Sequence, residues 1–227
     1  MRVIFYDLET TGFLPCGIMQ ICMIGIETDN EPSVLEYTTL VNPGERQVNR
    51  RVPHNLTLED VREAPMFEDI SDALNEFIRG STLVGFNNRR FDDRVLESAF
   101  GIENIFEIIE SSHDILPIVG GIRQDRALGE QDLMNPRSHD AWYDVMSLIA
   151  LVNRLDLGED FPEECSIAAE LLVGLLDMTE FNIPTAEDVP TYSENFVDDG
   201  YITVGIYAGR TLENIVAEDP WFANFLN

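Results

Sequence analysis

The chain has 227 residues, 42 of them acidic and 14 basic, and a formal net charge of −28 at pH 7. Hydrophobic residues make up 44% of the chain, which is enough for a globular core and excludes an intrinsically disordered protein. No apolar run approaches the ~18–20 residues that cross a bilayer, and the first residues do not form a signal peptide. Three cysteines fit a reducing compartment, so we expect a cytoplasmic protein without a membrane partner.

The negative charge has two interpretations. Phosphate backbones bind mainly Lys and Arg, so a charge of −28 argues by itself against a nucleic-acid partner. The alternative is a lineage-wide bias, because all 14 basic residues are Arg and none is Lys. The charge is also uneven: residues 1–156 and 157–227 each carry −14, although the second segment is less than half as long. This difference predicts a boundary near 156–162, where Gly, Pro and several acids occur together.

The predicted elements alternate in a way that is typical of an α/β fold. In chain order we expect three strands, a helix, a strand, a helix, an ambiguous strand or helix, and a long helix: residues 3–9, 18–28, 31–44, 67–80, 81–87, 90–101, 103–121 and 138–156. Short links make the first three strands antiparallel. A meander followed by alternating helices and strands indicates a mixed sheet with helices packed on it.

The acidic second segment predicts less regular structure. A helix over 165–178 is followed by a polar, proline-containing stretch and then by a strand, a turn and short helices. We therefore divide the chain into a main domain of residues 1–156, a helix and linker at 157–200, and a small C-terminal module at 201–227.

Asp7 and Glu9 are the first candidates for chemistry. They lie two residues apart in an apolar strand, so both side chains point to one face of the sheet. Two buried carboxylates repel each other unless a cation or a proton lies between them. The alternative is an edge strand with a solvated acidic face.

Two further pairs are ambiguous when taken alone. Asp92 and Asp93 follow a strand and open a helix, where acids in the first turn are common. His139 and Asp144 lie five residues apart, or about 140° around an ideal helix, and share a face only loosely. If His139 lies in the loop before the helix or in its first turn, His139 and Asp144 can both reach one site. Taken alone, His139 is typical of an ordinary surface histidine.

Together, these segments resemble a known family. FYDLETTG (5–12), LVGFNNRRFDDRVL (83–96) and HDAWYDV (139–145) are similar to the three motifs of the DEDDh, or DnaQ-like, 3′–5′ exonuclease superfamily. The resemblance covers about residues 1–155 and implies an α/β, ribonuclease H-like mixed sheet flanked by helices. It implies that the general base is His139 and that the metal ligands are Asp7, Glu9, Asp92 and Asp144.

The same resemblance implies the reaction and its cofactors. Two Mg²⁺ or Mn²⁺ ions prefer oxygen ligands, and four carboxylates balance their charge. The expected reaction is hydrolysis of the terminal phosphodiester at a nucleic-acid 3′ end, which releases a nucleoside 5′-monophosphate. His139 would accept the proton of the attacking water.

The expected substrate is single-stranded DNA. Phe86 replaces a histidine of the family motif, and the surrounding string is similar to exonuclease I-type members. RNA, short or cyclic oligonucleotides, and a non-catalytic acidic binding protein are the alternatives. The expected substrate contacts are Thr10, Thr11, Asn87, Arg89 and Arg90. A helix cap is the other interpretation of Asn87, and ion pairs with Asp93 or Glu97 are the other interpretation of the arginines.

The last segment carries a second resemblance. GIYAGRTLENIVAEDPWFANFLN (205–227) is similar to the small module that ends exodeoxyribonuclease X-type members. Ile206, Ala208 and Arg210 stand where that module has lysines, so its contact with nucleic acid would be reduced. Packing, or a protein partner bound through the acidic C-terminal segment, is the remaining expectation.

Overall fold

The computed structural model describes most of the first 182 residues. The described ranges are 1–29, 31–46, 48–49, 55–159 and 161–182, together with the backbone of short strands at 197–198 and 201–202. The chain divides into two units, Met1–Asn182 and Ile183–Asn227, and this division falls later in the sequence than the predicted boundary near 156. The predicted linker beyond residue 182 and nearly all of the predicted module at 201–227 lie outside the described residues.

A five-stranded mixed sheet forms the centre of the first unit. Its strands are β1 (Arg2–Thr10), β2 (Ile18–Glu27), β3 (Ser33–Leu40), β4 (Thr82–Gly85) and β5 (Ser111–Asp114), in the spatial order β3-β2-β1-β4-β5. The pairs β1–β2 and β2–β3 are antiparallel, whereas β1–β4 and β4–β5 are parallel. The predicted antiparallel meander and mixed sheet are therefore confirmed. In the second unit, β6 (Val197–Asp198) and β7 (Tyr201–Ile202) form an antiparallel pair.

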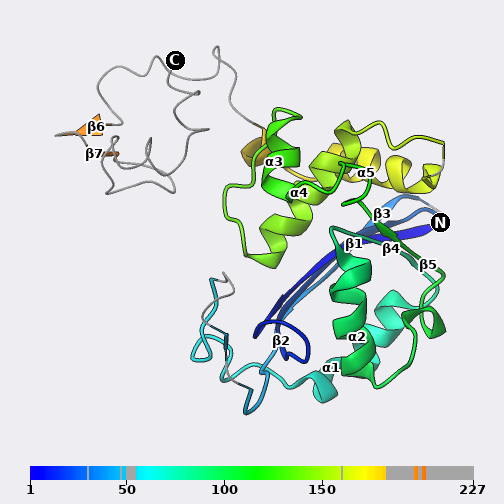
Figure 1. The fold of residues 1–227 in the computed structure, drawn as a ribbon. Helices are drawn as coiled ribbons and strands as arrows, with labels where there is room; N and C mark the ends of the chain where they lie inside the picture. Colours follow the sequence, from blue (N-terminus) through cyan, green and yellow to red (C-terminus); the bar gives the residue numbers. More distant parts are fainter. Residues whose placement is uncertain are drawn as a thin grey trace. The chain divides into compact units, whose positions relative to one another are not determined.

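Helices cover both faces of the sheet (Figure 1). They are α1 (Phe67–Ile78), α2 (Asp92–Phe100), α3 (Gln124–Gly129), α4 (Ala141–Arg154) and α5 (Glu163–Leu175), with 3-10 turns η1 (Asn88–Arg90), η2 (Ile105–Glu107) and η3 (Thr179–Phe181). Helices α3, α4 and α5 pack on one face, and α1 and α2 on the other. None of the helices within the described ranges is long and apolar enough to cross a membrane.

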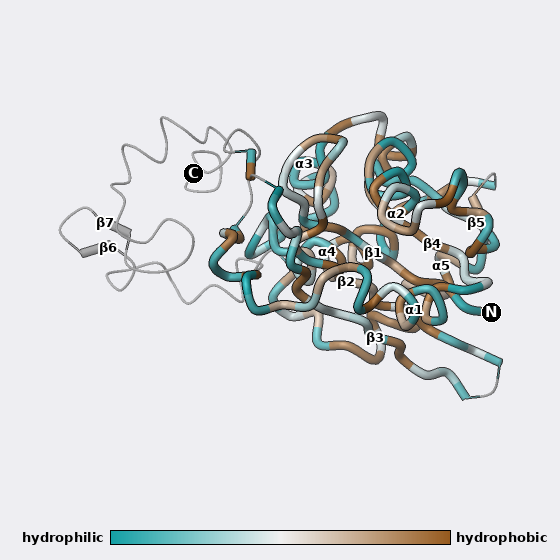
Figure 2. The backbone as a smooth tube through the Cα atoms, turned by 90° about the horizontal axis from the view of Figure 1, so that it is seen from below, coloured by the Kyte–Doolittle hydropathy of each residue, from teal (hydrophilic) through white to brown (hydrophobic). Residues whose placement is uncertain are grey.

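Alternate residues of β1 enter different cores. Val3 and Phe5 belong to the core shared with α4 and α5, whereas Ile4 and Tyr6 belong to the core shared with α1 and α2. Figure 2 shows β1 as a largely hydrophobic stretch between the helices. Because side chains alternate along a strand, the face of Val3 and Phe5 continues into Asp7 and Glu9, which therefore point toward α4. The residues that make β1 a buried strand thus also aim two carboxylates at one helix.

The long helix begins later than predicted. His139 has φ +65°, a left-handed conformation that an α-helix cannot continue. Asp140 then caps α4, because its Oδ1 atom accepts a hydrogen bond of 3.2 Å from the backbone N–H of Trp142. The helix therefore starts at Ala141 instead of residue 138, and His139 lies in the loop before it. The ambiguous segment 103–121 contains η2 and β5, and the six-residue α3 was not predicted from the sequence.

Candidate active site

Three carboxylates meet where β1 approaches the start of α4. Asp7 and Glu9 come from the last part of β1, and Asp144 comes from the first turn of α4. Each offers one carboxylate oxygen, and these three atoms all lie within 4.8 Å of one another. Hard divalent cations bind such oxygen-only donor sets, so the residues present fit a metal site.

Asp92 opens α2, on the far side of β1 from α4. It is 6% exposed, and the backbone N–H of Leu8 donates a hydrogen bond to it. Asp92 lies outside the group of three oxygens, but its charge raises the pKa of both Asp7 and Glu9. Four acidic groups from three elements therefore act on one another around the end of β1.

The pKa values of these groups reflect their burial and mutual repulsion. Burial is the main cause that raises the pKa of Asp7 well above its ordinary value, followed by repulsion from Asp144, Asp92 and Glu9. Burial also raises the pKa of Glu9 to about 8, that of Asp92 to about 8 and that of Asp144 to about 7. The site therefore favours either shared protons or a bound cation at neutral pH.

Hydrogen bonds orient the carboxylate of Asp144. Asn135 Nδ2 donates to Oδ1 over 2.6 Å, and the backbone N–H of His139 donates to Oδ2 over 3.0 Å. Gln124 Nε2 donates to the backbone carbonyl of Asp144 over 3.0 Å, and Gln20 Oε1 accepts from the N–H of Ala141 over 3.1 Å. Asn135, Gln124 and Gln20 were not predicted, because their contacts depend on tertiary structure and no local pattern marks them.

The loop before α4 is itself anchored. The backbone N–H of Met134 donates to the carbonyl of Phe181 over 2.9 Å, and Leu133 pairs with Asn182 in an isolated antiparallel bridge. His139 is partly buried in this loop, two residues before the first residue of α4. The backbone of His139 is thus held against Asp144 by its N–H hydrogen bond.

Thr10 and Thr11 form a fixed edge beside the carboxylates. Both are buried, and Thr10 Oγ1 donates to the carbonyl of Gly12 over 2.9 Å. The N–H of Thr11 donates to the carbonyl of Gly17 over 2.8 Å, which closes the turn between β1 and β2. Gly12 has φ +151° and lies against Asn49, so the turn leaves little room for a side chain there.

The other predicted substrate contacts lie on the turn after β4. Asn87 adopts a left-handed conformation with φ +63°, and its backbone N–H donates to Asp114 Oδ1 over 2.7 Å. Arg89 donates two hydrogen bonds, of 3.1 and 2.6 Å, to the carbonyl of Ser112. Arg90 is exposed, and its side chain forms no hydrogen bond or ion pair within the described ranges. Of the three, Arg90 is the side chain most available to a phosphate.

An ion pair with a nearby acid, the alternative role considered for the arginines, is formed by the neighbouring Arg94. Arg94 pairs with Glu97 over 2.9 Å, one turn along α2. Asp93, in contrast, is held by uncharged donors: the Tyr6 hydroxyl, Ser112 Oγ and Asn88 Nδ2. These residues stabilise the start of α2 and were not predicted as part of the site.

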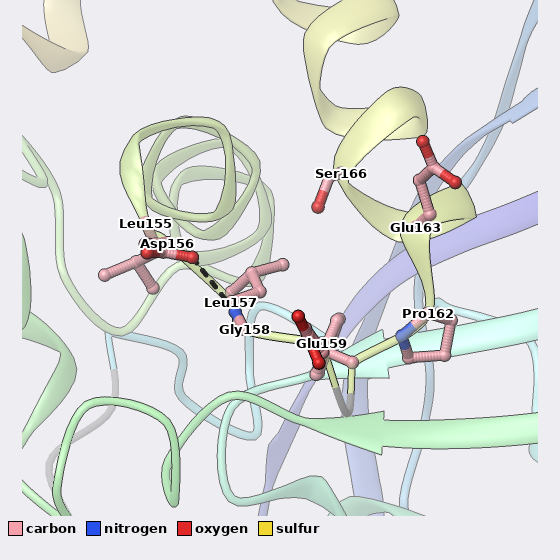
Figure 3. Close-up of a pocket in the computed structure, with 9 residues that line it drawn as sticks. Leu155, Asp156, Leu157, Gly158, Glu159, Pro162, Glu163 and Ser166 are labelled. Atoms are coloured by element: carbon pink, nitrogen blue, oxygen red, sulfur yellow. Dashed lines mark hydrogen bonds between the residues drawn. The ribbon is translucent and has the colours of Figure 1, made fainter.

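A separate hollow of about 650 Å³ lies at the opposite end of α4 (Figure 3). It is formed by the connection between α4 and α5, where Asp156 Oδ1 accepts a hydrogen bond of 3.1 Å from the N–H of Gly158. Its acidic lining residues are Asp156, Glu159 and Glu163. Asp144 is in the first turn of the 14-residue α4, so the helix separates the two places by roughly 15–20 Å. Negative charge makes this hollow unsuited to phosphate.

The family model described as Exonuclease (RNase T) matches residues 4–152, about two thirds of the chain. The chain belongs to the exonuclease family. Members of this family use divalent metal ions, in agreement with the cluster of Asp7, Glu9 and Asp144. The matched segment contains all five residues predicted to bind metal or act as the base.

Individual relatives of this chain are distant. Protein NEN4 of Arabidopsis thaliana is 27% identical in an alignment of 111 positions that covers 44% of this chain and 42% of that protein. The zinc-bound E. coli ExoI–ssDNA complex has a TM-score of 0.55 at 17% identity and covers 73% of this chain and 42% of its own. E. coli exonuclease I with a 5cy-dT13 oligonucleotide has a TM-score of 0.52 at 17% identity, with the same coverage. These structures confirm the ribonuclease H-like fold, and the chain spans about two fifths of the length of the relatives it matches.

Proposed function

We propose that this exonuclease hydrolyses the 3′-terminal phosphodiester of single-stranded DNA and releases nucleoside 5′-monophosphates. The proposal rests mainly on one observation: one carboxylate oxygen each of Asp7, Glu9 and Asp144 lies within 4.8 Å of the other two, in a chain of the exonuclease family. The preference for DNA rests on the exonuclease I-type string around Asp92 and on the ssDNA complexes of E. coli exonuclease I, whose fold is similar.

In this proposal Asp7, Glu9, Asp92 and Asp144 hold two Mg²⁺ or Mn²⁺ ions. Such ions lower the pKa of a bound water and stabilise the negative charge that develops on the leaving oxygen. The four carboxylates fix the place of the reacting phosphate, and Asn135 keeps Asp144 oriented. His139 accepts the proton of the attacking water.

The remaining contacts would bind the terminal nucleotide. The rigid backbone at Thr10 and Thr11 lines its pocket, and Asn87 and Arg90 approach the adjacent phosphate. Arg89 contributes indirectly, because its guanidinium already binds the Ser112 carbonyl. Few basic groups take part, so binding relies on the metal site, and the salt dependence of binding is shallower than for a basic nuclease.

A short or cyclic oligonucleotide is the second candidate substrate. The net charge of −28 favours it, because a small substrate meets less of the negative surface than a long strand does. The two candidates differ in the effect of substrate length. A rate that falls steeply as the strand lengthens supports the short substrate.

The proposal is tested with 5′-labelled single-stranded DNA and RNA of matched sequence, with Mn²⁺ or Mg²⁺ and with EDTA as a control. We expect a ladder that shortens from the 3′ end on DNA faster than on RNA. Asp7→Asn should abolish the ladder, whereas Asp156→Asn, the same charge change at the far end of α4, should leave it unchanged. Intact strands with the wild-type protein, or a ladder with Asp7→Asn, would refute the proposal.

Two weaker expectations belong to the same proposal. The acidic segment after residue 182 is a candidate surface for a protein partner, although it lies outside the described residues. The thiols of Cys16, Cys22 and Cys165 are all free, which supports a reducing compartment such as the cytoplasm.

A further inference from the structure

Asp93 is a buried carboxylate next to the predicted metal ligand Asp92. It is 5% exposed, and within the described ranges it forms no ion pair. A buried carboxylate is costly unless hydrogen-bond donors surround it. Asp93 therefore requires donors from neighbouring elements, although only its neighbour Asp92 is a predicted metal ligand.

Three uncharged donors from three different elements converge on Asp93. The hydroxyl of Tyr6, in β1, donates to Oδ1. Ser112 Oγ, in β5, donates to Oδ2 over 2.9 Å, and Asn88 Nδ2, in η1, lies 3.5 Å from Oδ1. Asn88 Nδ2 also donates to Ser112 Oγ over 2.8 Å, so the serine hydroxyl accepts one hydrogen bond from Asn88 and donates one to Asp93.

The network joins the elements that carry the separate carboxylates. Tyr6 precedes Asp7 in β1, and its side chain points to the opposite face of the sheet. Asp93 follows Asp92 in the first turn of α2. A hydrogen bond between Tyr6 and Asp93 therefore connects the strand of Asp7 and Glu9 to the helix of Asp92, immediately beside the site.

We propose that Tyr6, Asp93 and Ser112 are positioning residues that set the place of Asp92 relative to Asp7 and Glu9. This inference rests on the proposed function, because it assigns the network to the same metal site. Groups that orient metal ligands typically change metal affinity or activity by roughly 10–100-fold when they are removed. A purely structural role would lower the stability of α2 without changing the response to metal.

Tyr6→Phe and Ser112→Ala each remove a hydroxyl and leave the rest of the side chain in place. Glu97→Gln is the matched control, because Glu97 also lies on α2, is buried, and accepts hydrogen bonds from the N–H of Ile105 and from Arg94. For each variant the midpoint of thermal unfolding is measured in EDTA and against increasing Mn²⁺, and kcat and KM are measured on single-stranded DNA.

We expect Tyr6→Phe and Ser112→Ala to raise the Mn²⁺ concentration for half-maximal stabilisation by roughly tenfold or more. Their kcat should fall by a similar factor, with little change in KM. Because both hydroxyls act through Asp93, the double variant should lose less than the product of the two single losses. Glu97→Gln should lower the unfolding midpoint in EDTA but leave the Mn²⁺ response and kcat within twofold of wild type.

Two outcomes separate this inference from the proposed function. If Mn²⁺ stabilises the wild type and both hydroxyl variants equally, with kcat within twofold, the network is only structural and the inference is wrong. If the wild type neither cleaves DNA nor responds to Mn²⁺, the proposed function itself is wrong. Ser112→Ala supplies the test if Tyr6→Phe does not fold.

Discussion

The backbone N–H of His139 donates a hydrogen bond of 3.0 Å to Oδ2 of Asp144. The left-handed conformation of His139, with φ +65°, allows this contact, since it turns the chain just before α4 begins. The predicted base and a predicted metal ligand are therefore joined through the main chain, and this contact does not depend on the imidazole ring.

His139→Asn should separate catalysis from metal binding. Asparagine also tolerates a left-handed conformation, so the backbone hydrogen bond to Asp144 should remain. Loss of a general base typically costs about 10²–10⁴ in rate. We expect kcat to fall in that range while the stabilisation by Mn²⁺ in a thermal unfolding experiment stays close to wild type. Loss of the Mn²⁺ response would show that the variant disturbs Asp144 as well.

The metal-free protein should become less stable as the pH rises. Burial raises the pKa of Glu9 from 4.5 to about 8 and that of Asp144 from 3.8 to about 7. Between the unfolded and folded pKa values, the folded protein holds protons that the unfolded chain has released. The stability from these groups is thus fully present at low pH and is lost as the pH rises from about 4 to about 8.

Glu9→Gln tests this pH dependence. It removes one buried charge, so at pH 8 in EDTA it should be more stable than wild type by roughly 1–3 kcal/mol. The difference should shrink toward pH 5, and Mn²⁺ should stabilise the wild type but not the variant. Urea unfolding at several pH values measures these differences. A variant that is less stable than wild type at pH 8 would contradict the expected repulsion.

Asn135→Ala should weaken the metal site without loss of the fold. It removes the donor that lies 2.6 Å from Asp144 Oδ1, so the carboxylate is less well oriented. We expect the Mn²⁺ concentration for half-maximal activity to rise by roughly tenfold. Asn153→Ala, on the exposed side of α4, is the control and should behave as wild type. Equal metal dependence of the two variants would refute a role for Asn135.

Two glycine-to-alanine changes should have opposite effects on stability. At Gly25, in β2, a Cβ atom would lie 2.4 Å from the carbonyl oxygen of Val3, which is backbone and cannot move aside. Gly25→Ala should lower the free energy of unfolding by roughly 1–3 kcal/mol. At Gly174, in α5, a Cβ atom meets nothing within 4 Å, so Gly174→Ala should raise it by about 0.5–1 kcal/mol. Denaturant unfolding of both variants measures whether the free energy of unfolding falls or rises relative to wild type.

The apolar strand predicted at residues 3–9 was sufficient to predict that Asp7 and Glu9, two residues apart, share a face. The period of a strand is fixed, so Asp7 and Glu9 continue the face of Val3 and Phe5. The resemblance to a family then supplied Asp92, Asp144 and His139, which no local pattern distinguishes from surface residues. The mixed sheet followed from the order of the predicted elements.

The contacts that hold the carboxylates in place could not be predicted in the same way. The start of α4 depends on the left-handed His139, whereas the apolar spacing continues smoothly through that region. Ser112 lies in a polar strand that the sequence left ambiguous, and its role requires the parallel pairing of β4 with β5. Asn135 acts on Asp144 across a turn. Such contacts depend on tertiary structure, and hydrophobic periodicity carries no information about them.

The anchor between Met134 and Phe181 has a consequence for shortened forms of the protein. The family match ends at residue 152, whereas the hydrogen bond to Phe181 and the bridge to Asn182 lie almost thirty residues later. A proteolytic fragment that stops at the end of the match would retain every motif residue. It would nevertheless lose α5 and release the loop from which Asn135 and His139 hold Asp144. The presence of all the motifs therefore does not suffice for an active nuclease. The segment that contains Phe181 and Asn182 is needed as well, because it restrains this loop.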